Sequence, residues 1–186
     1  MLKWLGLDNV KPVKYKCFFC QCLVHSNRGY QTDNPNIKIC ICPGCSAPTY
    51  FMLENQIPAT AFGDKIKYVP EEIGKLYDEA RNCVGANAFT SAVLACRKIL
   101  MHIAVEKGAE EGKGFAFYVD YLARENYIPR DGEHWVKYIK DKGNEANHVI
   151  AIMEKKDAED LIVFLGGLLR NIWEYPGMLP KADSGD

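Results

Sequence analysis

Cys17-Phe18-Phe19-Cys20 and Cys42-Pro43-Gly44-Cys45 decide the fold of the N-terminal part of this sequence. Each stretch is a Cys-x-x-Cys pair, and residues 21–41 separate the two pairs. Two residues between cysteines let the chain turn so that both sulfurs reach one ion at roughly 2.3 Å, and two such turns supply four tetrahedral ligands. The sequence therefore predicts one structural zinc ion bound by Cys17, Cys20, Cys42 and Cys45.

The residues around these pairs have the outline of a zinc ribbon. Residues 21–25 and 37–41 are predicted strands, residues 26–29 (Ser-Asn-Arg-Gly) a predicted turn between them, and residues 49–53 a last strand. Cys22, Cys40 and His25 remain alternative ligands because they lie next to the two pairs. A disulfide framework is the other interpretation of so many cysteines, but the spacing and the lack of an export signal ahead of them favour metal and a cytoplasmic location.

A tetrahedral site closed by four thiolates leaves no coordination position for water or substrate. Its ordinary role is to hold a small fold together, since the free energy of metal binding becomes free energy of folding. We therefore take the predicted zinc as structural, and not as evidence of catalysis.

Composition places the chain among globular proteins of ordinary size. Of its 186 residues, 48% are hydrophobic and 25% are charged, and these proportions suit a packed core with a solvated surface. The longest apolar run, residues 161–169, is interrupted by Gly166-Gly167 and is shorter than the ~18 residues of a membrane span. We expect no membrane partner.

The net charge of −1 hides an uneven distribution. Residues 1–69 hold 8 Lys and Arg against 4 Asp and Glu, whereas residues 70–186 hold 15 against 20. A basic ribbon predicts contact with RNA or DNA, since cations bind phosphates and aromatic rings stack on bases. The candidate contacts are Lys14, Lys16, Phe18, Phe19 and Lys38. Alternatively, the lysines offset the charge of the thiolate cluster and the rings fill the ribbon core.

Helical periodicity begins at residue 70 and continues to the end of the ordered chain. We expect a bundle of five helices: one starting at Pro70 and stopping at Gly85, one capped by Asn87 and ending before Gly108, and three more over 117–126, 131–139 and 157–175. Asp131 and Asp157 are the predicted caps of the last two, and Tyr175-Pro176 the predicted end. The predicted domains are a zinc ribbon (1–57), a connector (58–69), the helical domain (70–177) and a disordered tail (178–186).

Lys140, Asn144 and His148 recur every four residues in the second half of this bundle. If the helix there is continuous, a cation, an amide and an imidazole share one surface, which suits phosphodiester chemistry. The alternative is that Gly143 ends the helix, Asn144 caps the next segment and His148 satisfies a buried backbone group.

Five stretches resemble an uncharacterised prokaryotic and phage family, a domain of unknown function similar to HEPN helical domains. They are Pro70-Glu71-Glu72-Ile73, Tyr77-Asp78-Glu79-Ala80, residues 92–100, Gly143-Asn144-Glu145-Ala146-Asn147-His148 and Trp173-Glu174-Tyr175-Pro176. The resemblance covers about residues 70–177 and implies a short helical bundle that forms a homodimer. Active HEPN members cut RNA without metal, using an Arg, a polar residue and a His.

Carried over to this chain, the resemblance places His148 at the histidine and Asn144 at the polar residue. Gly143 stands where active HEPN motifs have the Arg, and Lys140 where the uncharacterised family has one. Lysine keeps the charge but loses the planar fork that grips phosphate through two bonds. We therefore expect a zinc ribbon and a HEPN-like bundle that together bind or regulate in a phage or bacterial nucleic-acid or defence context. The alternatives are a metal-independent ribonuclease and a module for protein interaction alone.

Overall fold

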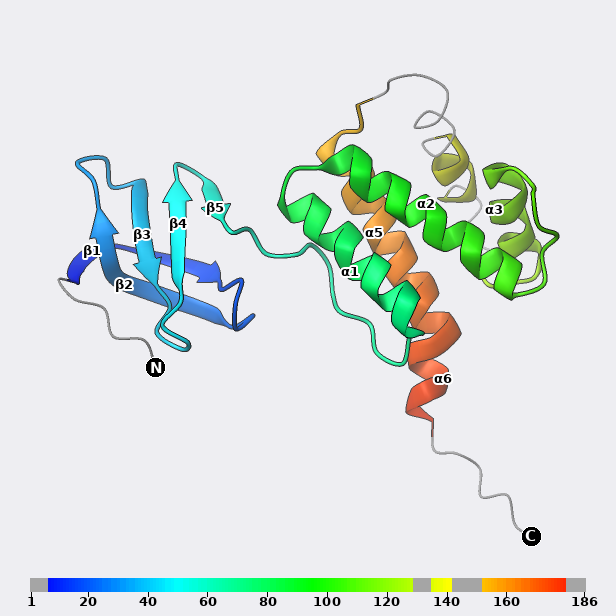
Figure 1. The fold of residues 1–186 in the computed structure, drawn as a ribbon, viewed down its shortest axis with the longest axis horizontal. Helices are drawn as coiled ribbons and strands as arrows, with labels where there is room; N and C mark the ends of the chain where they lie inside the picture. The colour runs from blue at the N-terminus through cyan, green and yellow to red at the C-terminus, as the bar shows by residue number, and fades with distance from the viewer. Residues whose placement is uncertain (1–6, 129–134, 142–151, 180–186) are drawn as a thin grey trace, which may run out of the picture. The chain divides into compact units, whose positions relative to one another are not determined.

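The computed structural model describes residues 7–128, 135–141 and 152–179. The chain divides into two compact units, Met1–Ala61 and Phe62–Asp186, here called the sheet unit and the helical unit. The first is an antiparallel sheet and the second is built of helices (Figure 1).

The sheet unit is a five-stranded meander in which each strand pairs with the next along the chain. Its strands are β1 (Asp8–Lys16), β2 (Leu23–Gln31), β3 (Ile37–Ile41), β4 (Pro48–Met52) and β5 (Asn55–Ile57). All four pairings are antiparallel, as local hairpin connections require. The buried set is small: Val10, Tyr15, Cys17, Cys40, Cys42 and Phe51. A core of this size is marginal without a further cross-link.

The predicted turn at residues 26–29 was wrong, because these residues lie inside β2. The Ser26 hydroxyl is buried and donates to the Ile41 carbonyl at 2.7 Å, which satisfies a polar group within the sheet. Gly29 faces the β3 backbone so closely that an added Cβ would lie 1.8 Å from the Ile39 carbonyl oxygen. The chain instead turns after β2, where the Asn36 N–H donates to the Asn34 side chain at 3.0 Å.

The helical unit packs its helices around one hydrophobic core. They are α1 (Glu71–Gly85), α2 (Phe89–Glu106), α3 (Phe115–Arg124), α5 (Lys155–Leu169), the π-helix η2 (Arg170–Glu174) and α6 (Tyr175–Met178), and residues 135–141 are also helical. Side chains from α2 and α5 such as Ile99, Leu100, Leu161 and Leu165 are almost fully buried in this core. Within the described ranges, none of the helices has the length and apolarity needed to cross a membrane.

α1, α2 and α3 all end in the same left-handed motif. After α1, Asn87 has φ +60°, its N–H bonds the Val84 carbonyl, and the next N–H, of Ala88, bonds the Cys83 carbonyl. Gly108 after α2 and Asn126 after α3 repeat this arrangement. Asn87 therefore terminates α1, and the prediction that it caps α2 was wrong.

The start and end of the last helix also differ from prediction. Glu154 is the N-cap of α5, and Asp157 is the third helical residue, whose carboxylate accepts from the Glu154 N–H at 3.2 Å in a capping box. At the other end the helix continues through η2 into α6, so Pro176 does not stop it. Proline is tolerated there because it lies in the first turn of α6. The predicted cap Asp131 lies outside the described residues.

Candidate metal centre

Two backbone turns of the same design carry the four predicted cysteines. In the first, the Cys17 N–H bonds the Cys22 carbonyl and the Gln21 N–H bonds the Cys17 carbonyl, both at 2.9 Å. In the second, the Cys42 N–H bonds the Ala47 carbonyl and the Ser46 N–H bonds the Cys42 carbonyl at the same distance. The β1–β2 and β3–β4 connections thus present two equivalent cysteine pairs.

The residue directly after each pair has a left-handed backbone: Gln21 has φ +59° and Ser46 has φ +62°. This conformation is costly for residues other than glycine, asparagine and aspartate, and it persists where the surroundings fix it. Here it closes each turn and returns the chain to the next strand. Sequence reasoning missed both positions, since neither Gln nor Ser signals a positive φ.

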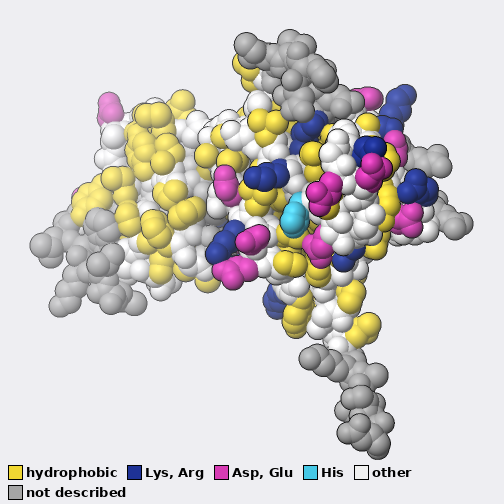
Figure 2. Space-filling view, turned by 45° about the vertical axis from the view of Figure 1, so that its right-hand side comes forward, with side chains coloured by type: hydrophobic (Ala, Val, Ile, Leu, Met, Phe, Trp, Pro, Cys, Tyr) yellow, Lys and Arg dark blue, Asp and Glu magenta, His cyan; other side chains and the backbone are white. Residues whose placement is uncertain are grey.

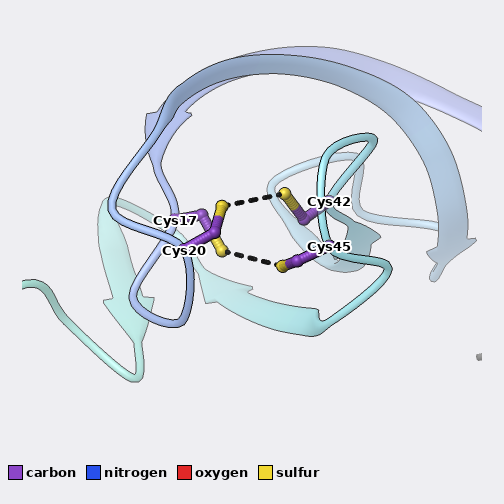
Figure 3. A group of neighbouring side chains, drawn as sticks. All are labelled: Cys17, Cys20, Cys42 and Cys45. Atoms are coloured by element: carbon purple, nitrogen blue, oxygen red, sulfur yellow. Dashed lines mark hydrogen bonds between the residues drawn. The ribbon is translucent and has the colours of Figure 1, made fainter. Parts of the chain in front are cut away.

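The four sulfur atoms form one compact group, each within 4.8 Å of the others. Cys17 Sγ lies 3.7 Å from Cys45 Sγ, and Cys20 Sγ lies 3.7 Å from Cys42 Sγ (Figure 3). A tetrahedral ion with metal–sulfur bonds of about 2.3 Å places its ligands about 3.8 Å apart. The group therefore has the donor type, number and spacing of a metal centre.

The remaining candidate ligands are not part of this group. All eight cysteines are free thiols, but Cys40 is buried in the core of the sheet and Cys22 is exposed, with its thiol directed to the Cys20 carbonyl. His25 lies in β2 opposite Lys14. Among the described residues, the structure thus gathers Cys17, Cys20, Cys42 and Cys45 and leaves these three alternatives outside.

Backbone N–H groups and burial set the acidity of the cluster. The Cys22 N–H, bonded to Cys20 Sγ, lowers the pKa of that thiol to about 7. The Ala47 N–H acts in the same way on Cys45, but burial and the three neighbouring thiols outweigh it and raise that pKa to about 12. Burial also raises the pKa of Cys17. The site therefore holds protons that a metal must displace.

The residues predicted to contact nucleic acid have different surroundings. Lys14 and Lys16 are exposed on β1, and Phe19 is 57% exposed with its ring edge-to-face against the half-buried Phe18. Lys38 is buried, and its ammonium donates to the Lys11 carbonyl at 2.8 Å. Lys38 is thus held by the sheet, and its contact with nucleic acid stays a prediction.

Of the predicted catalytic residues, only Lys140 belongs to the part of the chain that the structure describes. Its ammonium contacts both carboxylate oxygens of Asp120, at 2.9 and 3.0 Å, which links the helix at 135–141 to α3. This pairing neutralises the cation that the prediction assigned to phosphate. Asn144 and His148 lie outside the described residues.

Comparison with family models matches residues 78–181, more than half of the chain, to a family described as "Domain of unknown function (DUF4145)". No curated protein and no solved structure matches the chain. The matched segment spans most of the helical unit and begins after the four-cysteine cluster. The chain therefore belongs to the DUF4145 family and carries a sheet unit with a cysteine cluster ahead of the family domain.

Proposed function

We propose that Cys17, Cys20, Cys42 and Cys45 hold one structural Zn²⁺ and that the sheet unit is a zinc ribbon. The observation that carries this proposal is the group of four sulfurs with edges of 3.7 Å on two equivalent turns. Four thiolates at this spacing suit zinc, which prefers sulfur ligands and tetrahedral geometry. The ion joins the β1–β2 and β3–β4 connections, and so supplies the cross-link that the small core of the sheet needs.

With zinc in this role, the ribbon acts as a binding surface and not as a catalyst. Four thiolates and one Zn²⁺ carry a charge of −2 and leave no open coordination position. Any contact with a partner must therefore come from side chains around the metal.

The exposed face of β1 and β2 has the chemistry of a nucleic-acid contact. Lys14 pairs with His25 and Lys16 pairs with Leu23 across the two strands, and all four side chains are exposed. Directly opposite residues of an antiparallel pair share one face of the sheet. Phe19 follows on the adjacent turn, so two lysines, an imidazole and an aromatic ring are available to phosphates and bases.

We propose that this binding role belongs to a phage or bacterial nucleic-acid or defence context in the cytoplasm. We further propose that the helical unit is HEPN-like and pairs two chains into a homodimer. The resemblance in sequence supports this part of the proposal. Metal-independent RNA cleavage by His148, Asn144 and Lys140 is not the function we favour, because Asp120 already neutralises Lys140 and Gly143 stands in the arginine position.

Protein interaction through the ribbon is the second candidate, and the surface of the sheet unit favours it. Hydrophobic side chains gather over this unit on the face shown in Figure 2. The large exposed hydrophobic residues of the sheet unit as a whole are Phe19, Leu23, Tyr30, Met52, Leu53 and Ile57. Exposed apolar surface of this kind marks interaction sites in other proteins.

Binding measured against salt separates the two candidates. If lysines meet phosphates, affinity for single-stranded RNA or DNA falls steeply with salt, and Lys14→Ala with Lys16→Ala reduces the slope of log K against log salt by about 1 per lysine. Lys98→Ala, at an exposed lysine of α2, serves as the matched control and should leave the slope unchanged. Equal affinity and slope for the wild type and the double variant would reject the nucleic-acid proposal.

A further inference from the structure

A pocket of about 310 Å³ opens on the helical unit, far along the sequence from the cysteine cluster. Its lining residues are Lys107, Asn126, Tyr127, Asn171 and Ile172. The volume lies at the lower end of the range for small-molecule sites. Four of the five side chains are polar, which disfavours a purely apolar ligand.

Each of the three chain segments that line the pocket lies at a helix end or in a π-helix. Lys107 is the C-cap of α2, and Asn126 and Tyr127 form the left-handed end of α3, where the Tyr127 N–H bonds the Leu122 carbonyl. Asn171 and Ile172 belong to the π-helix η2. π-Helices are rare and occur frequently at functional sites.

The chain leaves the π-helix at Tyr175 and Pro176. The Tyr175 N–H bonds the Arg170 carbonyl, five residues earlier, in π-helical register. That register cannot continue, because residue 176 is proline and has no N–H. The Trp-Glu-Tyr-Pro stretch at residues 173–176 thus follows directly on the two π-helical residues that line the pocket, Asn171 and Ile172.

The charges around the pocket favour a neutral ligand over an anion. The Lys107 ammonium is close to the Glu106 carboxylate, at 3.8 Å, and 5.2 Å from the centroid of the Trp173 ring. The C-terminal ends of α2 and α3 both lie at the pocket, and helix C-termini carry partial negative charge. These contacts offset the single lysine of the lining.

The hydrogen-bonding groups then define the ligand class. The Asn171 amide and the Tyr127 phenol can each donate and accept, whereas the Asn126 amide already donates to the Arg124 carbonyl at 3.4 Å. A nucleobase has both donors and acceptors on its edge and a flat face for the apolar wall at Ile172. We propose that this pocket of the helical unit binds a nucleobase, through a site separate from the ribbon surface.

Titration of the full chain with adenosine, guanosine, cytidine and uridine, followed by calorimetry or NMR, tests this proposal. At least one nucleoside should bind with a Kd of about 1 mM or tighter. Asn171→Ala should weaken that binding at least tenfold, whereas Asn82→Ala, at an exposed asparagine that lines a different groove, should not change it. A short single-stranded RNA should compete with the nucleoside if the base arrives within a polymer, and should fail to compete if the ligand is a free nucleoside.

Three results would overturn the proposal: no nucleoside binding at concentrations on the order of 10 mM, binding that Asn171→Ala does not weaken, or equal binding of ribose 5-phosphate or a blocked dipeptide amide. The last result would identify an anion or a peptide as the ligand. The double variant Lys14→Ala, Lys16→Ala should leave nucleoside binding unchanged. The ribbon proposal and the pocket proposal can therefore fail independently of each other.

Discussion

At the scale of single residues, two adjacent glycines of α5 show how differently neighbouring positions can be constrained. A Cβ added at Gly166 would lie 2.7 Å from the Tyr77 hydroxyl, whereas one added at Gly167 would meet nothing within 4 Å. Gly166 therefore allows close packing of α5 against α1 within one chain. Packing within one chain is therefore enough to explain a glycine at this position.

We expect Gly167→Ala and Gly166→Ala to change the stability of the helical unit in opposite directions. Gly167→Ala should raise the free energy of unfolding by up to about 1 kcal/mol, because alanine has the higher helix propensity. Gly166→Ala should lower it by about 1–3 kcal/mol through overpacking against Tyr77. Urea unfolding followed by circular dichroism measures both changes, and Tyr77→Phe in the Gly166→Ala background should recover part of the loss.

The acidity of the cysteines predicts how metal binding depends on pH. Cys17 and Cys45 have raised pKa values and are protonated at neutral pH, while the Cys20 pKa is lowered to about 7. Zinc must displace the protons on Cys17 and Cys45, so its affinity rises with pH with a slope of about two or more in log K per pH unit. Below about pH 7 Cys20 also binds a proton and the slope steepens. Competition with a zinc-binding dye measures the slope, and a pH-independent affinity would contradict this assignment.

At the scale of secondary-structure elements, the N-terminus of α5 combines a cap with a tertiary contact. Asp157 is buried, accepts from the Glu154 N–H, and also accepts from the Tyr138 hydroxyl at 3.1 Å. The same Tyr138 O–H is shared with the Asp160 carboxylate, at 3.2 Å. Asp157 thus joins α5 to the helix at 135–141, whereas the contacts of Glu154 among the described residues are those of the capping box.

Asp157→Ala should therefore be more destabilising than Glu154→Ala. Loss of one side of the capping box at Glu154 should lower the free energy of unfolding by about 1 kcal/mol. Loss of Asp157 should lower it by about 2–3 kcal/mol, because the cap is lost and a buried hydrogen bond with it. Equal effects of the two substitutions in chemical denaturation would show that the contact with Tyr138 contributes nothing.

The sequence predicted the presence of helices and turns better than the residues at which they begin and end. Apolar periodicity located α1 and α2, and the cysteine spacing located the two turns that the structure brings together. The sequence could not locate the β2–β3 turn, because Ser26-Asn27-Arg28-Gly29 has the composition of a turn. Only the β3 backbone beside Gly29 shows why a glycine stands within the strand. Asn87 was assigned to the wrong helix because an asparagine between two helices can end one or begin the next. The polar pocket was missed because three separate helix ends form it.

At the scale of the whole molecule, the chain combines two units with different sources of stability. The helical unit, which contains most of the DUF4145 match, has an extensive buried core of its own. The sheet unit has a small core and a cluster of four cysteines. Only the sheet unit should therefore depend on metal.

The homodimer proposed for the helical unit is a property of the whole molecule. Light scattering should give twice the mass of the 21.0 kDa chain at concentrations on the order of 100 μM, where an interface of ordinary strength is filled. The mass of a single chain at that concentration would reject the homodimer, and with it the composite site that the ribonuclease alternative needs.

Elemental analysis of the purified chain and of Cys42→Ser tests the central claim, a structural zinc held by four cysteines, most directly. We expect one zinc per wild-type chain. In Cys42→Ser we expect loss of this zinc and unfolding of the sheet unit, while the helical signal in circular dichroism persists. Cys40→Ser would disturb the core, so Cys22→Ser, at an exposed thiol outside the cluster, is the matched control and should retain zinc. A wild-type protein without zinc, or one with a disulfide joining the two pairs, would contradict the account.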